Sequence, residues 1–273
     1  MSYINKNSNQ VILILAGGLG KRMNSDLPKV IHNINNKPML VHIIEKAAEI
    51  NPFKILIVVG KYESLIKDKI NEFIDNETMN KIIFIQQKEA LGTGHAIICA
   101  KKVLKTMREK NLLILSGDTP LIDTNLINNM FVNLKNFKIC TTCLEVPFGY
   151  GRVFSYFNEN KKITKIIEHN DCNEREININ LINCGIYAFR IELLLKYLHM
   201  LSNNNNNNEY YITDLIEIIE NRENLEVEMF KIIKEKNYLV LGVNTPDQLK
   251  QIEIFMKQLR NLKDNNSRKI LIQ

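Results

Sequence analysis

The first half of this chain alternates short, almost continuously apolar runs with amphipathic segments of helical spacing. Such apolar runs are typical of strands in a parallel sheet, because helices cover both faces of that kind of sheet. We expect strands at residues 11–15, 54–59, 81–86 and 112–118, each followed by a helix. Pro38 is well placed to open the first helix. The pattern therefore predicts an α/β fold with a Rossmann-like, mostly parallel sheet flanked by helices.

The second half is less regular. We expect extra strands in ICTTCLEV, GRVFSYF, KITKIIEH and LINCGIYAF, joined by short turns and capping the earlier sheet. Helices are expected at about 191–201, 212–221 and 246–262. The asparagine run at 203–208 predicts a floppy, solvated loop between two helices.

The organisation predicted from these patterns is simple. A polar N-terminal tail at 1–10 precedes a single domain at 11–263, and a C-terminal tail follows at 264–273. Neither an internal repeat nor a linker marks a boundary within the central range.

Composition narrows the class of partner. The chain has 36 basic and 30 acidic residues, a net charge of +6, which suits an anionic ligand. Because the lysines are scattered, we do not expect nucleic acid as a partner. The early apolar run is too short for a signal peptide or a membrane span. Five cysteines without framework-like spacing favour reduced thiols in a cytoplasmic protein.

A C-x-x-C pair is formed by Cys140 and Cys143, in a β-prone run. Residues three apart in a strand point to opposite faces, and a second pair that could complete a zinc site is missing from the sequence. We therefore interpret both as ordinary thiols.

The loop after the first predicted strand, LAGGLGKRMNSDLPK, combines three glycines with three cationic side chains. A P-loop needs Ser or Thr where Arg22 stands, and a dinucleotide fingerprint needs glycine where Met23 stands. Glycine lets backbone N–H groups approach phosphate oxygens, and Arg22 can bind an oxyanion with two N–H groups. An ordinary tight turn is the alternative. With Lys29 also present, we expect phosphate binding.

Two polar side chains follow predicted strands further along. Asp118 comes directly after a buried strand, and its carboxylate is either a ligand for Mg²⁺ or the N-cap of a helix. Asn244 follows a short apolar run, and its amide either completes the metal site or shapes the turn before Pro246. Ligands of parallel sheets bind beyond the carboxyl ends of the strands, so we expect these loops to converge on one cleft.

A third dense stretch, QQKEALGTGHA, opens a helix. Gly92 and Thr93 supply backbone donors and a hydroxyl at its positive end, and the amide of Gln87 could read the edge of a base. By itself the G-T-G pattern has low specificity. His95 is interpreted as a structural helix residue.

Eight motifs occur in order: LAGGLGKRM…SDLPK, QQKEALGTGHA, LSGDTPLI, GYGR, IIEHND, NCGIYAF, EYYITDL and GVNTPDQL. Together they resemble the nucleotidyltransferases that make UDP-sugars, most closely the uridyltransferase domain of the N-acetylglucosamine-1-phosphate uridyltransferases, also called UDP-N-acetylglucosamine pyrophosphorylases. The match runs from about residue 11 to 249. It implies a nucleotide-diphospho-sugar transferase fold.

The resemblance also implies roles for particular residues. The expected contacts to the UTP phosphates are Gly17, Gly18, Gly20, Arg22 and Lys29, and those to uracil are Gln87, Gly92 and Thr93. The expected contacts to the amino sugar are Gly151, Glu168 and Asn183, with Tyr211 and Thr213 near the sugar or its phosphate. Asp118 and Asn244 are expected to hold Mg²⁺, and Arg22 and Lys29 to be catalytic.

The reaction implied by the resemblance joins UTP and N-acetylglucosamine 1-phosphate into UDP-N-acetylglucosamine and pyrophosphate. The alternatives are another sugar-1-phosphate, cytidylyl- or thymidylyltransferase and, from a different class, a non-catalytic sugar-nucleotide sensor. Ser116 stands where some family members carry Tyr, and Cys184 stands where Thr or Ser is common, which leaves sugar selectivity open. The tail shows no hexapeptide repeat, so we expect no left-handed β-helix acetyltransferase domain. The sequence leaves the oligomeric state open.

Overall fold

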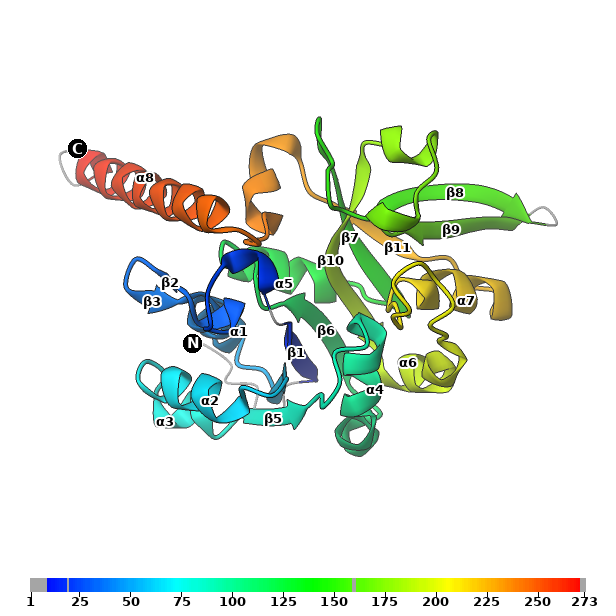
Figure 1. Ribbon diagram of the computed structural model, residues 1–273, viewed down its shortest axis with the longest axis horizontal. Coiled ribbons are helices and arrows are strands. Elements are labelled where there is room, and N and C mark those ends of the chain that lie inside the picture. Colours follow the sequence, from blue (N-terminus) through cyan, green and yellow to red (C-terminus); the bar gives the residue numbers. More distant parts are fainter. Residues whose placement is uncertain (1–8, 19, 159–160, 271–273) are drawn as a thin grey trace.

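A computed structural model of the chain describes residues 9–18, 20–158 and 161–270 (Figure 1). Within these residues the main sheet has nine strands, in the order β11-β7-β10-β6-β1-β4-β5, with the hairpin β8–β9 attached through β10. The strands are β1 (Gln10–Ala16), β4 (Lys54–Val59), β5 (Ile82–Gln86), β6 (Asn111–Ser116), β7 (Phe137–Cys143), β8 (Arg152–Asn158), β9 (Lys161–Ile167), β10 (Leu181–Arg190) and β11 (Glu228–Lys231). A separate small hairpin is formed by β2 (Asn33–Ile34) and β3 (Lys37–Pro38).

Helices cover both faces of this sheet. They are α1 (Met39–Ala48), α2 (Glu63–Asn71), α3 (Asn76–Met79), α4 (Thr93–Leu104), α5 (Thr124–Phe131), α6 (Ile191–Tyr197), α7 (Asp214–Arg222) and α8 (Pro246–Ile270). Alternate residues of β1 show the two layers. Ile12 and Ile14 pack with α1, α2 and α5, whereas Val11 and Leu13 pack with α4, α6 and α7. All four are fully buried, which explains the continuous apolar run.

The first half of the fold matches the prediction. β1 pairs in parallel with β4 and β6, and β4 pairs in parallel with β5. α1 begins directly after Pro38, as expected. The predicted α/β fold, a mostly parallel sheet flanked by helices, is therefore confirmed.

The second half corrects one expectation. Its strands do not cap the earlier sheet but extend it, because β10 runs antiparallel between β6 and β7, and β11 adds in parallel to β7. A strand edge with unpaired backbone groups favours such an addition. The register of β10 shifts between Asn183 and Tyr187, where Gly185 has a φ of 70°. This bulge bends β10 beside the site described below.

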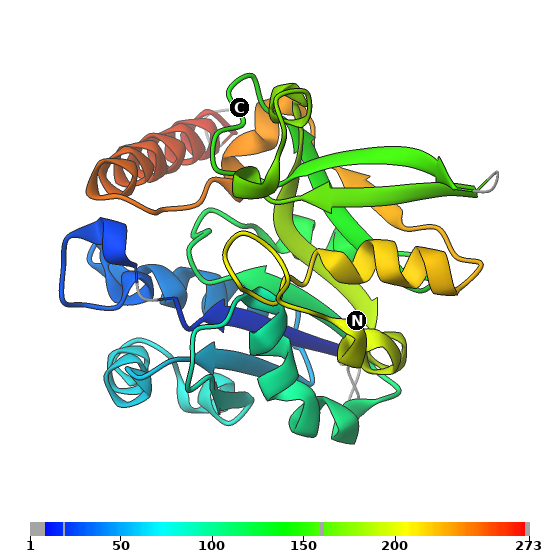
Figure 2. The same ribbon diagram turned by 45° about the vertical axis from the view of Figure 1, so that its right-hand side comes forward.

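The hairpin β8–β9 and α7 pack together on the side of the molecule away from β5 (Figures 1 and 2). In the same strand region, Cys140 is buried within β7, and Cys143 is exposed at the end of that strand.

α8 leads away from the sheet (Figure 1) and packs through Ile252 against Met23, Ile34 and Met39. In the described part of the chain, no helix combines the length and the apolar character that a membrane span requires.

Candidate active site

A cavity of about 260 Å³ lies where β1, β5 and β6 end at the same edge of the sheet. Parallel α/β sheets place their ligands at this edge, because the loops after the strands leave a crevice there. The predicted residues that line the cavity are Gly17, Gly18, Lys29, Gln87, Gly92, Thr93 and Asp118. The structure thus brings together three segments that are far apart in the sequence.

The glycine loop packs closely against the backbone of Lys29, which lines this cavity. Gly20 has a φ of 63°, and a Cβ at this position would lie 2.6 Å from the Cβ of Lys29. Only glycine therefore allows the loop to pass so close to the lysine backbone. The next residues form a short 3-10 helix, Lys21–Met23, which carries Arg22.

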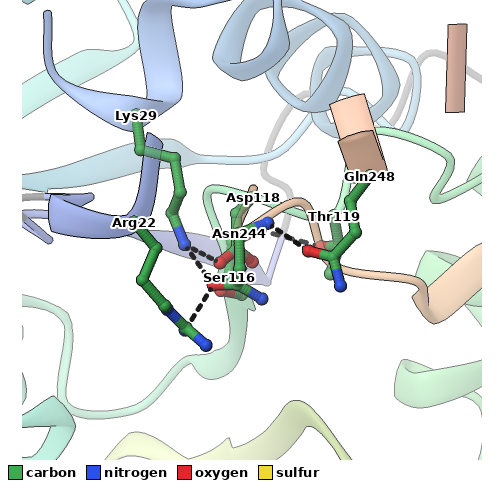
Figure 3. A network of polar contacts seen from close by, with 7 residues as sticks. All are labelled: Arg22, Lys29, Ser116, Asp118, Thr119, Asn244 and Gln248. Atoms are coloured by element: carbon green, nitrogen blue, oxygen red, sulfur yellow. Dashed lines mark hydrogen bonds and ion pairs between the residues drawn. The ribbon is translucent and has the colours of Figure 1, made fainter. Parts of the chain in front are cut away.

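Arg22, Lys29, Asp118 and Asn244 form one polar network, named here the Lys29 cluster (Figure 3). The ammonium of Lys29 forms an ion pair with Oδ2 of Asp118 and donates a 2.9 Å hydrogen bond to Oδ1 of Asn244. Nη2 of Arg22 donates to the same amide oxygen at 3.1 Å. The side chains of Lys29 and Asp118 are only 13% and 18% exposed, so solvent screens this pair weakly.

The donor set of this cluster fits a hard divalent cation. Among the described residues, His, Cys, Asp and Glu form no group of three that could hold a metal ion. Nevertheless, a carboxylate oxygen and an amide oxygen both contact one Nζ, so they converge on a single point. Mg²⁺ prefers such oxygen ligands and takes its other ligands from water and substrate phosphates.

Sequence reasoning missed the role of the neighbours of Asp118. In the sequence Ser116 stands out only as a departure from the family pattern, but its hydroxyl donates a 2.7 Å hydrogen bond to Oδ1 of Asp118. The backbone N–H of Val243 donates to the carbonyl of Asp118 at 2.9 Å, which joins the strand end to the segment that carries Asn244. Spacing alone gives no signal for this second contact.

The opposite wall of the cavity is formed by the turn before α4. Gln87 is buried, and its Nε2 donates to the carbonyl of Gly92 at 3.1 Å and lies 3.2 Å from Nδ1 of His95. The amide is therefore held in one orientation, and His95 has the structural role that we expected.

The same turn also contacts the segment that precedes α7. Gly92 has a φ of 97°, and a Cβ there would lie 2.6 Å from the carbonyl oxygen of Tyr210. Oγ1 of Thr93 accepts a hydrogen bond from the N–H of Ile212 at 3.2 Å. Glu209, which the sequence reasoning did not select, lines the cavity at this contact, and burial raises the pKa of its carboxyl. Its only sequence signal is its place at the start of the EYYITDL motif.

The remaining predicted residues form a second group, named here the Glu168 cluster: Gly151, Glu168, Asn183, Tyr211 and Thr213. The hydroxyl of Thr213 donates to Oε1 of Glu168 at 3.0 Å. A Cβ at Gly151 would lie 3.4 Å from the other oxygen of Glu168, and the N–H of Asn183 donates to the carbonyl of Gly151 at 2.9 Å. The five residues are therefore neighbours in the fold, although they are spread over positions 151–213 of the sequence.

Two side chains of the Glu168 cluster are engaged by other parts of the protein. Nδ2 of Asn183 donates to the hydroxyl of Tyr187 at 2.6 Å, and its Oδ1 accepts from the N–H of Gly185 at 3.2 Å. The hydroxyl of Tyr211 accepts from Asn207 at 2.7 Å. The asparagine run is thus joined to this cluster through the side chain of Asn207.

Burial sets the protonation behaviour around Glu168. It raises the pKa of the Glu168 carboxyl, a shift that the hydrogen bond from Thr213 opposes. Burial also raises the pKa of Tyr211 to about 12 and that of Asp214 to about 6. Glu168, Tyr211 and Asp214 therefore ionise at a higher pH than the same groups do in water.

Comparisons with known proteins show the family of this chain. Residues 12–169 match the model of the MobA-like NTP transferase domain. A probable UDP-N-acetylglucosamine pyrophosphorylase of Acanthamoeba polyphaga mimivirus is 38% identical over 261 residues, which cover 94% of this chain and 100% of that protein. A bifunctional protein GlmU of Clostridium botulinum is 39% identical over 255 residues, which cover 92% of this chain and 53% of that protein. The chain thus spans about half the length of the second relative.

Solved structures share the fold. A UDP-glucose pyrophosphorylase complexed with UDP-glucose superposes with a TM-score of 0.69 at 17% identity, covering 91% of this chain and 98% of the other. An apo UDP-glucose pyrophosphorylase gives 0.68 at 16% identity, covering 92% and 99%. At these identities the likeness shows the common architecture and nothing finer.

Proposed function

This chain belongs to the family of MobA-like NTP transferases, and from that premise we propose that it makes UDP-N-acetylglucosamine and pyrophosphate from UTP and N-acetylglucosamine 1-phosphate. The observation that carries the proposal is the Lys29 cluster at the mouth of the strand-end cavity. It gathers two cations and two oxygen donors beside the residues expected to bind uracil. The similarity to the mimivirus protein over its full length supports the choice of product.

The proposed step is a direct displacement at phosphorus. An oxygen of the sugar 1-phosphate attacks the α-phosphorus of UTP and forms a new O–P bond. The bond from that phosphorus to the bridging oxygen breaks, and pyrophosphate leaves with the electron pair. The attacking oxygen is already an anion, so no protein group has to remove a proton.

The main task of the protein is to bring two anions together in line. Arg22 and Lys29 supply fixed positive charge where the phosphates of both substrates would meet, and this reduces their repulsion. Asp118 and Asn244 would hold Mg²⁺, which when bound supplies further stabilisation of negative charge on phosphate oxygens. Glu168 and Thr213 would position the sugar through hydrogen bonds to its hydroxyl groups.

A substrate panel tests the proposal. Pyrophosphate release is measured with UTP, CTP and dTTP, each against N-acetylglucosamine, glucose and galactosamine 1-phosphates, with and without Mg²⁺. We expect the highest kcat/KM for UTP with N-acetylglucosamine 1-phosphate, and turnover only with Mg²⁺. Preference for another pair would identify another transferase, and binding of UTP without turnover would identify a sugar-nucleotide sensor.

A further inference from the structure

Resting on the proposed function, we propose that Ser116 and Gln248 are positioning residues that aim the two oxygen donors, Asp118 and Asn244, at one cation site. Each of them hydrogen-bonds one donor residue at an atom other than the oxygen that contacts Lys29 (Figure 3). Neighbours of this kind commonly change metal affinity by about 10- to 100-fold when they are removed.

Ser116 supports the donor that comes from the sheet. It is the last residue of β6 and pairs in register with Leu15 of β1, so its backbone position is fixed. The hydroxyl of Thr119 donates to the carbonyl of Ser116 at 3.0 Å and holds the turn that follows. The Ser116 hydroxyl donates to Oδ1 of Asp118 at 2.7 Å, so Oδ2 remains available for Mg²⁺. In this structure Oδ2 contacts the ammonium of Lys29.

Gln248 supports the donor that comes from the C-terminal helix. The N–H of Gln248 donates to Oγ1 of Thr245 at 3.2 Å, which is one half of a capping box at the start of α8. The Gln248 side chain reaches back one residue further than in a standard box and accepts from the N–H of Asn244 at 2.7 Å. The first turn of α8 therefore fixes the backbone from which the Asn244 amide points toward Lys29 and Arg22.

Ser116 and Gln248 differ in exposure, and this predicts which of them has the larger effect on Mg²⁺ binding. Ser116 is half-buried and lines the cavity, whereas the side chain of Gln248 is exposed. Water can replace an exposed acceptor more easily than a buried donor. We therefore expect Ser116→Ala to raise the half-saturating Mg²⁺ concentration by about tenfold or more, and Gln248→Ala to raise it by about threefold.

The test uses the full chain and two measurements. One is the Mg²⁺ dependence of turnover at saturating substrates, and the other is the rise in melting temperature that Mg²⁺ alone produces. Ser116→Thr keeps the hydroxyl and Gln248→Glu keeps an acceptor, so both should restore Mg²⁺ dependence toward that of the unmodified chain. Thr245→Ala is the matched control, because it removes the other half of the same helix cap but leaves the contact between Gln248 and Asn244.

The expected result is a raised Mg²⁺ requirement in the two alanine variants at positions 116 and 248, and an unchanged one in Thr245→Ala. An unchanged requirement in both, or an equal rise in Thr245→Ala, would overturn the proposal. The melting measurement separates it from the proposed function. If the unmodified chain makes no sugar nucleotide, positioning is still supported by a Mg²⁺-induced shift that Asp118→Asn loses, that Ser116→Ala shows only at higher Mg²⁺ concentration, and that Thr245→Ala keeps. A shift that is absent, or equal in all variants, refutes it.

Discussion

The Lys29 cluster and the Glu168 cluster differ in how charge and burial are arranged. In the first, two cations share the oxygen atoms of one carboxylate and one amide. In the second, the carboxyl of Glu168 has a hydroxyl as its hydrogen-bond partner, and burial raises its pKa. The first cluster therefore has surplus positive charge, and the second has partly desolvated acceptors.

Under the proposed function, the first cluster would bind phosphates and the second the sugar. Surplus positive charge attracts phosphates, whereas a buried carboxylate accepts strong hydrogen bonds from neutral hydroxyl groups and repels anions. The turn at Gly92 lines the same cavity as Lys29 and Asp118, and it contacts the segment at 209–213 that carries Thr213. The predictions below test this division, in order of decreasing effect.

The largest effect is expected on the phosphate side. Arg22→Ala and Asp118→Ala should each lower kcat by at least about 10²–10³, or about 3–4 kcal/mol of transition-state stabilisation, because each removes a charged group at the reacting phosphates. Steady-state kinetics measure this, with circular dichroism to verify folding. Lys69→Ala is the control for Arg22→Ala, since it removes an equal charge from an exposed ion pair with Glu72 at the end of α2. Near-normal turnover in either active-site variant would remove that residue from the mechanism.

The junction between the clusters should be the next most sensitive point. Gly92→Ala should lower the free energy of unfolding by about 2–4 kcal/mol, because the new Cβ combines a strained backbone with a clash against Tyr210. Chemical denaturation measures the change.

Two other glycines separate the causes of that loss. Gly149 has a φ of 81° with no atom within 4 Å of the new Cβ, so Gly149→Ala reports strain alone. Gly18 has neither feature, so Gly18→Ala should change stability little. Equal stability losses in all three variants would show that the contact with Tyr210 is unimportant.

The Glu168 cluster should control one substrate only. Glu168→Gln should raise the KM for the sugar phosphate by about tenfold, about 1.4 kcal/mol, and change the KM for UTP little. The unmodified enzyme should also lose affinity for the sugar phosphate as the pH falls, because the raised pKa of Glu168 makes it protonate early. The glutamine variant should lack this pH dependence. A changed KM for UTP instead would break the division between the clusters.

The smallest effect concerns stability beside the Glu168 cluster. Burial raises the pKa of Asp214 from 3.8 to about 6, so the folded chain binds this proton more tightly than the unfolded chain does. The stabilisation is complete below pH 4 and is lost as the pH rises through about 6. Asp214→Asn should therefore gain about 1 kcal/mol relative to the unmodified chain between pH 4 and 7, after allowance for solvent screening.

The contribution of Asp75 to stability should depend on pH in the opposite direction. The backbone N–H of Thr78 lowers the pKa of its carboxyl, so its contribution to stability is present at neutral pH and is lost as the pH falls. Denaturation at a series of pH values measures both variants, and the same sign for Asp75→Asn and Asp214→Asn would contradict the account.

Much of the first half could be predicted because its signals are local. Continuous apolar runs place the strands, and the strand ends place Arg22, Lys29 and Gln87 at one edge of a parallel sheet. The Glu168 cluster has no such signal. The strand β10 joins it to the sheet through an antiparallel pairing that the sequence does not reveal, and the expected cap was therefore wrong.

Local residue patterns specify the layered α/β architecture and the cationic loop, because burial periodicity and glycine conformation act over a few residues. Which atoms meet in the site depends on long-range packing. The contact of Asn244 with Lys29 spans 215 positions along the chain, and that of Thr213 with Glu168 spans 45. Contacts at such separation depend on the order and register of strands, and these are set by the packing of the whole sheet.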